Sequence, residues 1–299
     1  MKKRILYTIL FFVLLIAFDR ITGLCLNRGL NTYFGLDQHS EVLFIGHSHL
    51  MLAVDKTDFE TKTKTTVSKY CREGVNVADR YQMVRQYLNL PACDSLRYVI
   101  YGVDQFMFTG EGLSENSYKL FYPFIDEPVM NDYIKSSTDF SDYLLHKTIC
   151  CTRYSDALLN SSIRGWMHDW NNYKSGYLDV KNLELQIANN QQRHIKFEQD
   201  LIDDFEQTLS LLESNGITTI LVNTPIAKPL NEYEPEKYSR FINYMKQLDS
   251  SSMIIYWDLN PGYSEQYNLF FDPIHLNMDG QKVVNRELVN RFNTLKSTL

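Results

Sequence analysis

The 299-residue sequence has no stripe of basic residues and none of the motifs with which proteins read DNA or RNA. Its formal net charge is −6, with 30 Lys and Arg against 36 Asp and Glu. Nucleic acids are bound mainly through clustered cations, so this composition argues against a nucleic-acid partner. Internal repeats, low-complexity tracts and linker-like stretches are also absent, which argues against a repeat architecture.

Cysteine is scarce as well, with five residues at irregular positions: Cys25, Cys71, Cys93, Cys150 and Cys151. This spacing fits neither a disulfide framework nor a zinc site. Cys71 and Cys93 could form one bridge in an oxidising compartment, whereas the adjacent Cys150 and Cys151 would pair only under strain. We expect all five cysteines to be mainly structural.

One long apolar run, Ile5–Phe18, follows the basic residues 2–4 and ends at Asp19-Arg20. Fourteen helical residues span about 21 Å, less than the hydrocarbon core of about 30 Å. Residues 21–26 would complete the span if the two charges snorkel. No small-x-small cleavage site follows, which favours a signal anchor over residues 1–26 rather than a cleaved signal peptide. The basic cluster predicts a single-pass cell-membrane protein whose C-terminal domain is extracytoplasmic.

Behind this anchor, short apolar runs alternate with amphipathic segments. The runs predicted as strands are 42–45, 67–70, 98–102, 217–222 and 253–257. The segments predicted as helices are 78–90, 197–212, 238–248 and 278–295. This alternation predicts an α/β fold, a three-layer sandwich with a parallel flavodoxin-like sheet, over residues 40–299. Residues 105–196 break the alternation, and we expect an insertion over the sheet edge that shapes a substrate groove; a separate small domain is the alternative.

Two motifs supply the groups that acyl transfer through a serine needs. Gly46-His47-Ser48-His49-Leu50 follows the first strand, and Asp272-Pro273-Ile274-His275 precedes the last helix. Ligand sites in parallel sheets lie at the carboxyl ends of the strands, where Ser48 would be the nucleophile. His275 would be its base, and Asp272 would orient the imidazole and stabilise its charged form. Each motif alone also fits a helix cap, but the two together, in this topology, favour catalysis.

The two motifs resemble those of the SGNH hydrolases, or GDSL-type esterases. The resemblance is to the membrane-anchored cell-envelope branch, which includes the D-alanine transfer protein of teichoic acid modification and exopolysaccharide acetyltransferases. It covers about residues 40–104 and 197–299. It implies that Ser48 is the nucleophile, that Asp272 and His275 are its acid and base, and that Gly74 is an oxyanion donor.

Gly102-Val103-Asp104 is similar to the third block of that family, Gly-x-Asn, which implies further oxyanion residues at Gly102 and Asp104. Asp104 departs from the pattern, because an ionised carboxylate would repel the developing negative charge. Three alternatives follow from this departure. Asp104 is protonated, or its side chain points away, or the oxyanion is bound by backbone N–H groups alone.

His47 and His49 also fit a metal-binding pattern, with Asp272 and His275 as further ligands. Residues two apart at a strand-to-helix turn are expected to point in different directions, and no second carboxylate motif completes such a set. We therefore expect no metal and no cofactor. His47 and His49 are expected to line the pocket, where His49 could also hydrogen-bond locally.

Two functional classes remain open. The first is an extracytoplasmic serine-dependent O-acyl esterase or transferase that moves acetyl or another small acyl group on a surface polysaccharide or cell-wall polymer. Hydrolysis and transfer share an acyl-enzyme, so the sequence leaves them undecided. The second is a non-catalytic accessory protein that binds a glycan or docks onto a membrane-bound O-acyltransferase, with Asp104 as the mark of decayed catalysis.

Overall fold

The computed structural model describes residues 1–110, 116–249 and 253–298. The chain divides into two compact units. The helical unit comprises Met1–Asp37 and Asn116–Asp169, and the sheet unit comprises Gln38–Glu115 and Trp170–Leu299. Residues 116–169, which fall in the expected insertion, thus group with the N-terminal helix, and this helix supplies apolar surface that the segment has little of by itself.

The helical unit is built on one long helix and a set of short ones. In chain order these are α1 (Lys2–Phe34), the 3₁₀ segment η2 (Ser117–Phe124), α5 (Pro128–Ser137), α6 (Phe140–Thr148), the 3₁₀ segment η3 (Cys150–Arg153) and α7 (Asp156–Trp166). The backbones of α1 and α7 meet at Gly29 and Gly165. A Cβ atom on Gly165 would lie 1.8 Å from the Gly29 carbonyl oxygen, so only glycine permits this approach.

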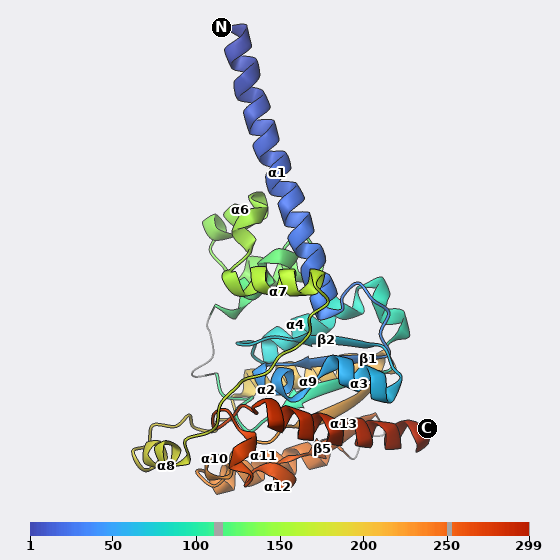
Figure 1. The fold of residues 1–299 in the computed structure, drawn as a ribbon, viewed down its shortest axis with the longest axis vertical. Coiled ribbons are helices and arrows are strands. Elements are labelled where there is room, and N and C mark those ends of the chain that lie inside the picture. The colour runs from blue at the N-terminus through green and yellow to red at the C-terminus, as the bar shows by residue number, and fades with distance from the viewer. Residues whose placement is uncertain (111–115, 250–252, 299) are drawn as a thin grey trace. The chain divides into compact units, whose positions relative to one another are not determined.

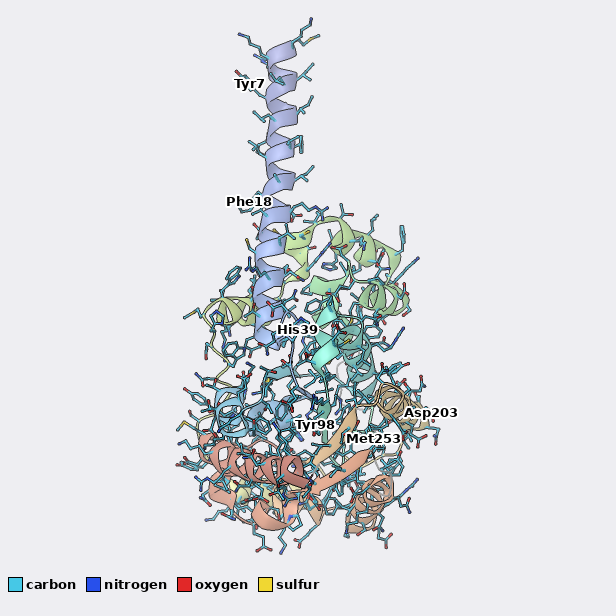
Figure 2. The ribbon with its side chains drawn as sticks, turned by 90° about the vertical axis from the view of Figure 1, so that its right-hand side faces the viewer. Tyr7, Phe18, His39, Tyr98, Asp203 and Met253 are labelled. Carbon is cyan, nitrogen blue, oxygen red and sulfur yellow. The ribbon has the colours of Figure 1, made fainter. Side chains whose placement is uncertain are left out.

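The first half of α1 carries apolar side chains that no other segment of its unit covers. Tyr7 and Phe18 are 66% and 67% exposed, and Figure 2 shows the helix between them standing clear of the other helices of this unit. α1 is long and apolar enough to cross a membrane, as predicted. It continues beyond the predicted anchor end at residue 26 and stops at Phe34, where Gly35 takes the left-handed conformation of a helix C-cap.

The sheet unit contains five parallel strands in the order β2-β1-β3-β4-β5, which Figure 1 shows between two layers of helices. The strands are β1 (Val42–Gly46), β2 (Val67–Cys71), β3 (Tyr98–Val103), β4 (Thr218–Asn223) and β5 (Ile254–Asp258). This strand order is the flavodoxin-like one. The predicted fold class is therefore confirmed, and each predicted strand lies within one or two residues of the observed one.

Successive strand residues point to opposite faces of the sheet, and aromatic contacts identify the helices on each face. On one face Phe44 packs against Phe59, and Tyr98 against Phe292, with ring centroids 5.1 and 5.2 Å apart. On the other face Tyr101 contacts Phe205 at 5.5 Å. The first face is covered by α2 (Ser48–Ala53), α3 (Lys56–Thr63) and α13 (Met278–Thr298), and the second by α4 (Val77–Leu88) and α9 (Gln199–Ser214).

Shorter elements complete the sheet unit. They are η1 (Pro91–Ser95), α8 (Val180–Ala188), α10 (Lys228–Asn231), α11 (Pro235–Leu248), α12 (Asn260–Tyr263) and η4 (Tyr267–Leu269). All five cysteines of the chain are free thiols, so Cys71 and Cys93 form no bridge in this structure. Burial raises the pKa of the Cys71 thiol to about 12, which makes it inert and agrees with a structural role.

Candidate active site

Ser48 is held at the carboxyl edge of the sheet by tight packing of the short helix behind it. β1 ends at Gly46, and Ser48 is the first residue of α2. Leu50 of α2 lies against both Gly46 and Gly102, and a Cβ atom on either glycine would approach the Leu50 Cβ to 2.9 Å. The two glycines let α2 lie close to β1 and β3. Ser48 is thereby fixed where the strand order reverses, the usual ligand position in such sheets.

The loop before α13 is shaped by the side chain of Asp272. Its Oδ1 accepts hydrogen bonds from the backbone N–H groups of Ile274 and His275, at 3.0 and 2.9 Å. The Phe271 N–H donates in turn to the His275 carbonyl at 2.9 Å. Such an Asx turn fixes the backbone through a local side chain, and it leaves Oδ2 free to meet the His275 ring.

Ser48, His275 and Asp272 form a continuous hydrogen-bonded chain. His275 Nδ1 lies 2.7 Å from Asp272 Oδ2, and His275 Nε2 lies 2.7 Å from Ser48 Oγ. Burial raises the pKa of Asp272, but the hydrogen bonds from His275 and from two backbone amides outweigh it, and the net pKa is lowered. An ionised Asp272 accepts the Nδ1 proton, so Nε2 carries the lone pair and receives the serine O–H. This is the geometry that a general base needs.

Two residues at the cavity have backbone amides without a partner in the described ranges, Ser48 and Gly74. The N–H groups of Ser48 and Gly74 donate to no other residue in the described ranges, and both residues line the cavity. Gly74 has a φ of +80°, and no heavy atom lies within 4 Å of the place that a Cβ atom would take. Gly102, also expected among the oxyanion residues, lies inside β3 and is not among the described residues that line the cavity. Of the expected oxyanion residues, Ser48 and Gly74 therefore have unpaired amides at the cavity within the described ranges.

Asp104 is turned toward His47. Its Oδ2 accepts a 2.5 Å hydrogen bond from His47 Nε2, and its Oδ1 accepts one of 2.8 Å from the Phe106 amide. Burial raises the pKa of Asp104, but the attraction and hydrogen bond of His47, with smaller contributions from His49 and Arg80, lower it far below the usual range. Asp104 is thus an ionised acceptor with both oxygens engaged. Asp104 lines the cavity, but both of its oxygens are engaged, so of the three alternatives this arrangement favours an oxyanion site made of backbone N–H groups.

The expectation that His47 and His49 point in different directions is wrong. Their ring centroids lie 4.3 Å apart, and His49 Nδ1 lies 4.0 Å from Asp104 Oδ2. His47 is the N-cap of α2, and its ring folds back so that Nδ1 accepts the His49 amide at 3.1 Å. Capping the amide two residues further along the chain brings the two rings to the same side.

The ligand atoms of His47, His49 and Asp104 lie within 4.8 Å of one another, as in a metal site. A histidine that binds a metal normally donates its other ring N–H. His47 Nδ1 instead accepts a backbone N–H, so Nε2 must carry the proton that it donates to Asp104. The hydrogen bonds therefore fit a neutral histidine beside a carboxylate better than a ligand set. Asp272 and His275, the other two residues of the metal-binding alternative, are engaged in the hydrogen-bonded chain to Ser48.

His49 is buried, with 8% of its side chain exposed, and its Nδ1 has no hydrogen-bond partner in the part of the chain that the structure describes. Burial, followed by the neighbouring His47, lowers the pKa of His49 well below the usual value, so the ring is neutral. The ring meets that of His275 edge-on, with centroids 5.2 Å apart. His49 therefore forms part of the cavity wall and packs against His275.

The cavity has a volume of about 240 Å³. Four polar residues in its wall were not found from the sequence: Asn76, Arg80, Gln192 and Arg193. Asn76 Oδ1 accepts the Asp79 amide at 2.8 Å in a capping box, so its Nδ2 is a donor. The Asn-x-x-Asp pattern before a predicted helix could have revealed Asn76.

Arg80 is 1% exposed and donates to the carbonyls of Gly102 and Asn76, at 2.7 and 3.1 Å. It ties the carboxyl end of β3 to the start of α4, and its charge helps to keep Asp104 ionised. Nothing in the sequence marks it, because an arginine in an amphipathic helix usually lies at the surface.

No protein-family model and no curated protein matches this chain. Among solved structures, it is similar to a candidate platelet activating factor from Streptococcus pneumonia, with 10% identity and a TM-score of 0.40, over 95% of this chain and 98% of that one. A candidate acylhydrolase from Bacteroides fragilis gives 12% identity and a TM-score of 0.41, over 84% and 87%. A lipase from a goat rumen metagenome gives 11% and 0.40, over 83% and 94%. These values define no family, and the functional argument rests on the geometry of the site.

Proposed function

We propose that this protein is an extracytoplasmic, membrane-anchored O-acyl esterase or acyltransferase that uses Ser48 as its nucleophile. The substrate is a cell-surface glycan or cell-wall polymer that carries a small ester-linked acyl group, and acetyl is the acyl group that we propose first. The observation that carries the proposal is the unbroken chain from Ser48 Oγ through His275 to Asp272, with 2.7 Å at each step.

In the first half-reaction Ser48 Oγ attacks the ester carbonyl while its proton passes to His275 Nε2. The Asp272 carboxylate stabilises the resulting imidazolium through Nδ1. The negative charge that develops on the carbonyl oxygen is bound by the Ser48 and Gly74 amides, with the Asn76 Nδ2 group as a further donor in the same wall. Collapse of the intermediate breaks the ester bond, and the leaving alcohol takes the proton from His275.

In the second half-reaction His275 removes a proton from water or from a sugar hydroxyl, which then attacks the acyl-Ser48 carbonyl. The acceptor's oxygen leaves with the acyl group, and the proton returns to Ser48 Oγ. Water gives an esterase and a sugar hydroxyl gives a transferase, since both pass through the same acyl-enzyme.

The size of the cavity supports a small acyl group. Its volume of about 240 Å³ lies below the range of about 300–1,000 Å³ that is usual for drug-sized ligands. Phe106, Met107, Leu230 and Ile274 supply an apolar part of the wall, which suits the methyl end of an acetyl group. The choice of a surface polymer as acceptor follows from the apolar N-terminal helix and the basic residues before it.

The proposal is tested with a fluorophosphonate probe, which labels an activated serine covalently. Purified full-length protein should be labelled, Ser48→Ala should lose the label completely, and His275→Ala should be labelled at least a hundredfold more slowly. Ser161→Ala, which removes a half-buried serine of α7, is the matched control and should be labelled like the wild type. Labelling of Ser48→Ala at the wild-type rate, or no labelling of the wild type, would refute the catalytic role.

The acceptor is tested with acetylated polysaccharide or cell-wall fragments. Released acetate indicates hydrolysis, and movement of isotope-labelled acetyl groups between glycans indicates transfer. The wild type should do one or the other, and Ser48→Ala neither. If acetate is released only from lipid esters, the glycan assignment is wrong while the serine mechanism stands.

A further inference from the structure

The short helix α6 carries its apolar residues on the outside of the helical unit. Phe140 is 76% exposed, Leu144 50% and Leu145 44%, and Ile149, just after the helix, is 42% exposed. At 3.6 residues per turn, these four positions fall within about one half of the helix circumference. α6 buries none of its residues.

The opposite side of α6 is polar and faces the other helices of the unit. Asp142 accepts hydrogen bonds from the Tyr122 hydroxyl at 2.5 Å and from Thr138 at 3.1 Å. The His146 ring stacks on Tyr122, with centroids 3.9 Å apart, and Lys147 forms a 2.9 Å ion pair with Asp126. A helix at a water-facing surface shows the reverse pattern, with its polar side outward. The polar side of α6 is satisfied by protein, whereas its apolar side is exposed in the part of the chain that the structure describes.

α6 ends beside the part of α1 where the long apolar run stops. Asp19 accepts hydrogen bonds from the Cys150 and Cys151 amides, at 2.9 and 2.8 Å. Arg20 donates to the Thr148 carbonyl at 2.8 Å. Figure 1 shows α6 at this level of α1, within the same unit. The two charges that interrupt the apolar run are therefore both paired with backbone groups, as charges near a bilayer must be.

The length of α1 places this level inside the membrane boundary. Counted from Ile5, a hydrocarbon core of about 30 Å takes about 20 helical residues at roughly 1.5 Å each, which brings its far edge close to Leu24. Leu24 is 72% exposed, and Trp166 of α7, which is 50% exposed, donates its indole N–H to the Cys25 carbonyl at 2.9 Å. Tryptophan is typical of the membrane–water interface. Asp19, Arg20 and the end of α6 thus fall just within the edge of the hydrocarbon core.

We propose that the apolar face of α6, formed by Phe140, Leu144, Leu145 and Ile149, is embedded in the lipid at the extracytoplasmic surface of the membrane. The helical unit then attaches the protein to the membrane through two elements. α1 crosses the bilayer, and α6 lies in the interface beside it. The occupant is lipid because the end of α6 is bonded to α1 at Asp19 and Arg20, the level where the exposed apolar run of α1 ends. This inference rests on the membrane anchor in the proposed function, and it is independent of Ser48.

The test uses full-length protein in phosphatidylcholine vesicles, with or without bromine atoms on the acyl chains. Brominated chains quench tryptophan emission only at close range, so they report contact with lipid. Leu144→Trp adds a tryptophan on the proposed face, and Phe140→Trp tests a second position on it. Lys282→Trp, at a site of α13 that is 60% exposed, is the matched control. The emission of the wild type, with its three native tryptophans, is subtracted.

Brominated lipid should quench the added emission of Leu144→Trp and Phe140→Trp at least twice as strongly as that of Lys282→Trp. Equal quenching at all three sites, in protein that floats with the vesicles, would overturn the proposal. It would mean that the apolar face of α6 is not in lipid and is free to bind a protein partner instead. Failure to float at all would refute the anchor as well. Ser48→Ala should show the same quenching pattern, which separates this result from the outcome of the labelling experiment.

Discussion

Two histidine–aspartate pairs flank Ser48, and they use the same two side chains in opposite ways. In the first pair His275 gives its Nδ1 proton to Asp272 and turns its Nε2 lone pair to the serine. In the second pair His47 gives its Nε2 proton to Asp104, and its Nδ1 lone pair accepts a backbone amide. Pairing with a carboxylate therefore does not by itself make a histidine a general base. The partner of its second nitrogen decides whether that nitrogen has a lone pair for the serine.

The two pairs also differ in burial. Asp272 is 35% exposed and Asp104 only 2%. The first pair lies in the loop before α13 and is partly open to solvent, so it can exchange protons. In the second pair both carboxylate oxygens of Asp104 already accept hydrogen bonds, from His47 and from the Phe106 amide. This pair stabilises the turn that carries Ser48. We interpret the His275–Asp272 pair as the catalytic one, and the His47–Asp104 pair as one that positions Ser48.

The strongest test of this comparison removes each histidine in turn. His275→Ala should lower kcat for a small acetyl ester by about 10³–10⁵-fold, because the general base is lost. His47→Ala should lower kcat by no more than about 100-fold, since Ser48 keeps its base and loses only positioning. Steady-state kinetics on both full-length variants measures the difference. A loss in His47→Ala as large as that in His275→Ala would abolish the distinction between the two pairs.

The aspartate of the catalytic pair gives the next largest effect. In Asp272→Asn the amide can present N–H to Nδ1, which favours the tautomer with its proton on Nε2 and leaves no lone pair for the serine. We expect kcat to fall by about 10²–10⁴-fold with little change in KM. A kcat within a factor of three of the wild type would show that Asp272 does not set the tautomer.

The aspartate of the second pair should affect stability more than chemistry. In Asp104→Asn the side-chain oxygen continues to accept the hydrogen bond from the Phe106 amide. The Nδ2 group then faces the proton on His47 Nε2, so two donors oppose each other. His47 cannot relieve this contact by changing tautomer, because its Nδ1 accepts the His49 amide. We expect about 1–3 kcal/mol of destabilisation and a kcat within about tenfold of the wild type, from urea unfolding and kinetics on one preparation. A loss of kcat comparable to that of Asp272→Asn would place Asp104 in the chemistry.

The sequence revealed one pair and not the other for a physical reason. Asp272 and His275 are three residues apart and bond locally, and the parallel topology brings every strand's carboxyl end, including that of β1 before Ser48, to the same edge. The bond between His47 and Asp104 joins residues 57 apart and depends on a ring orientation that capping imposes. Gly102 has the spacing of an oxyanion block, yet strand pairing retains it inside β3. The catalytic roles of these residues remain predictions.

The helical unit was less accessible to sequence reasoning. Hydrophobic spacing on α6 predicts that the apolar side faces a core, and nothing local shows that it faces outward. The grouping of residues 116–169 with α1 depends on a backbone contact between Gly29 and Gly165, which no periodicity records. The domain boundaries drawn from the sequence therefore remain a prediction, whereas the strands, being short buried runs between turns, were located within one or two residues.

The smallest expected effect concerns pH and follows from His49, which is packed between the two pairs. Burial lowers the pKa of His49 well below 6.5, so below that pH the unfolded chain binds a proton that the folded chain does not. Stability therefore falls as the pH falls, by up to about 1.4 kcal/mol per pH unit for this one proton. His49→Gln keeps a similar polar volume and cannot titrate, so its free energy of unfolding should decline less steeply between about pH 6.5 and 5 than that of the wild type. Urea unfolding of both full-length proteins in detergent across this range measures the two slopes, and equal slopes would mean that His49 takes up its proton in the folded state.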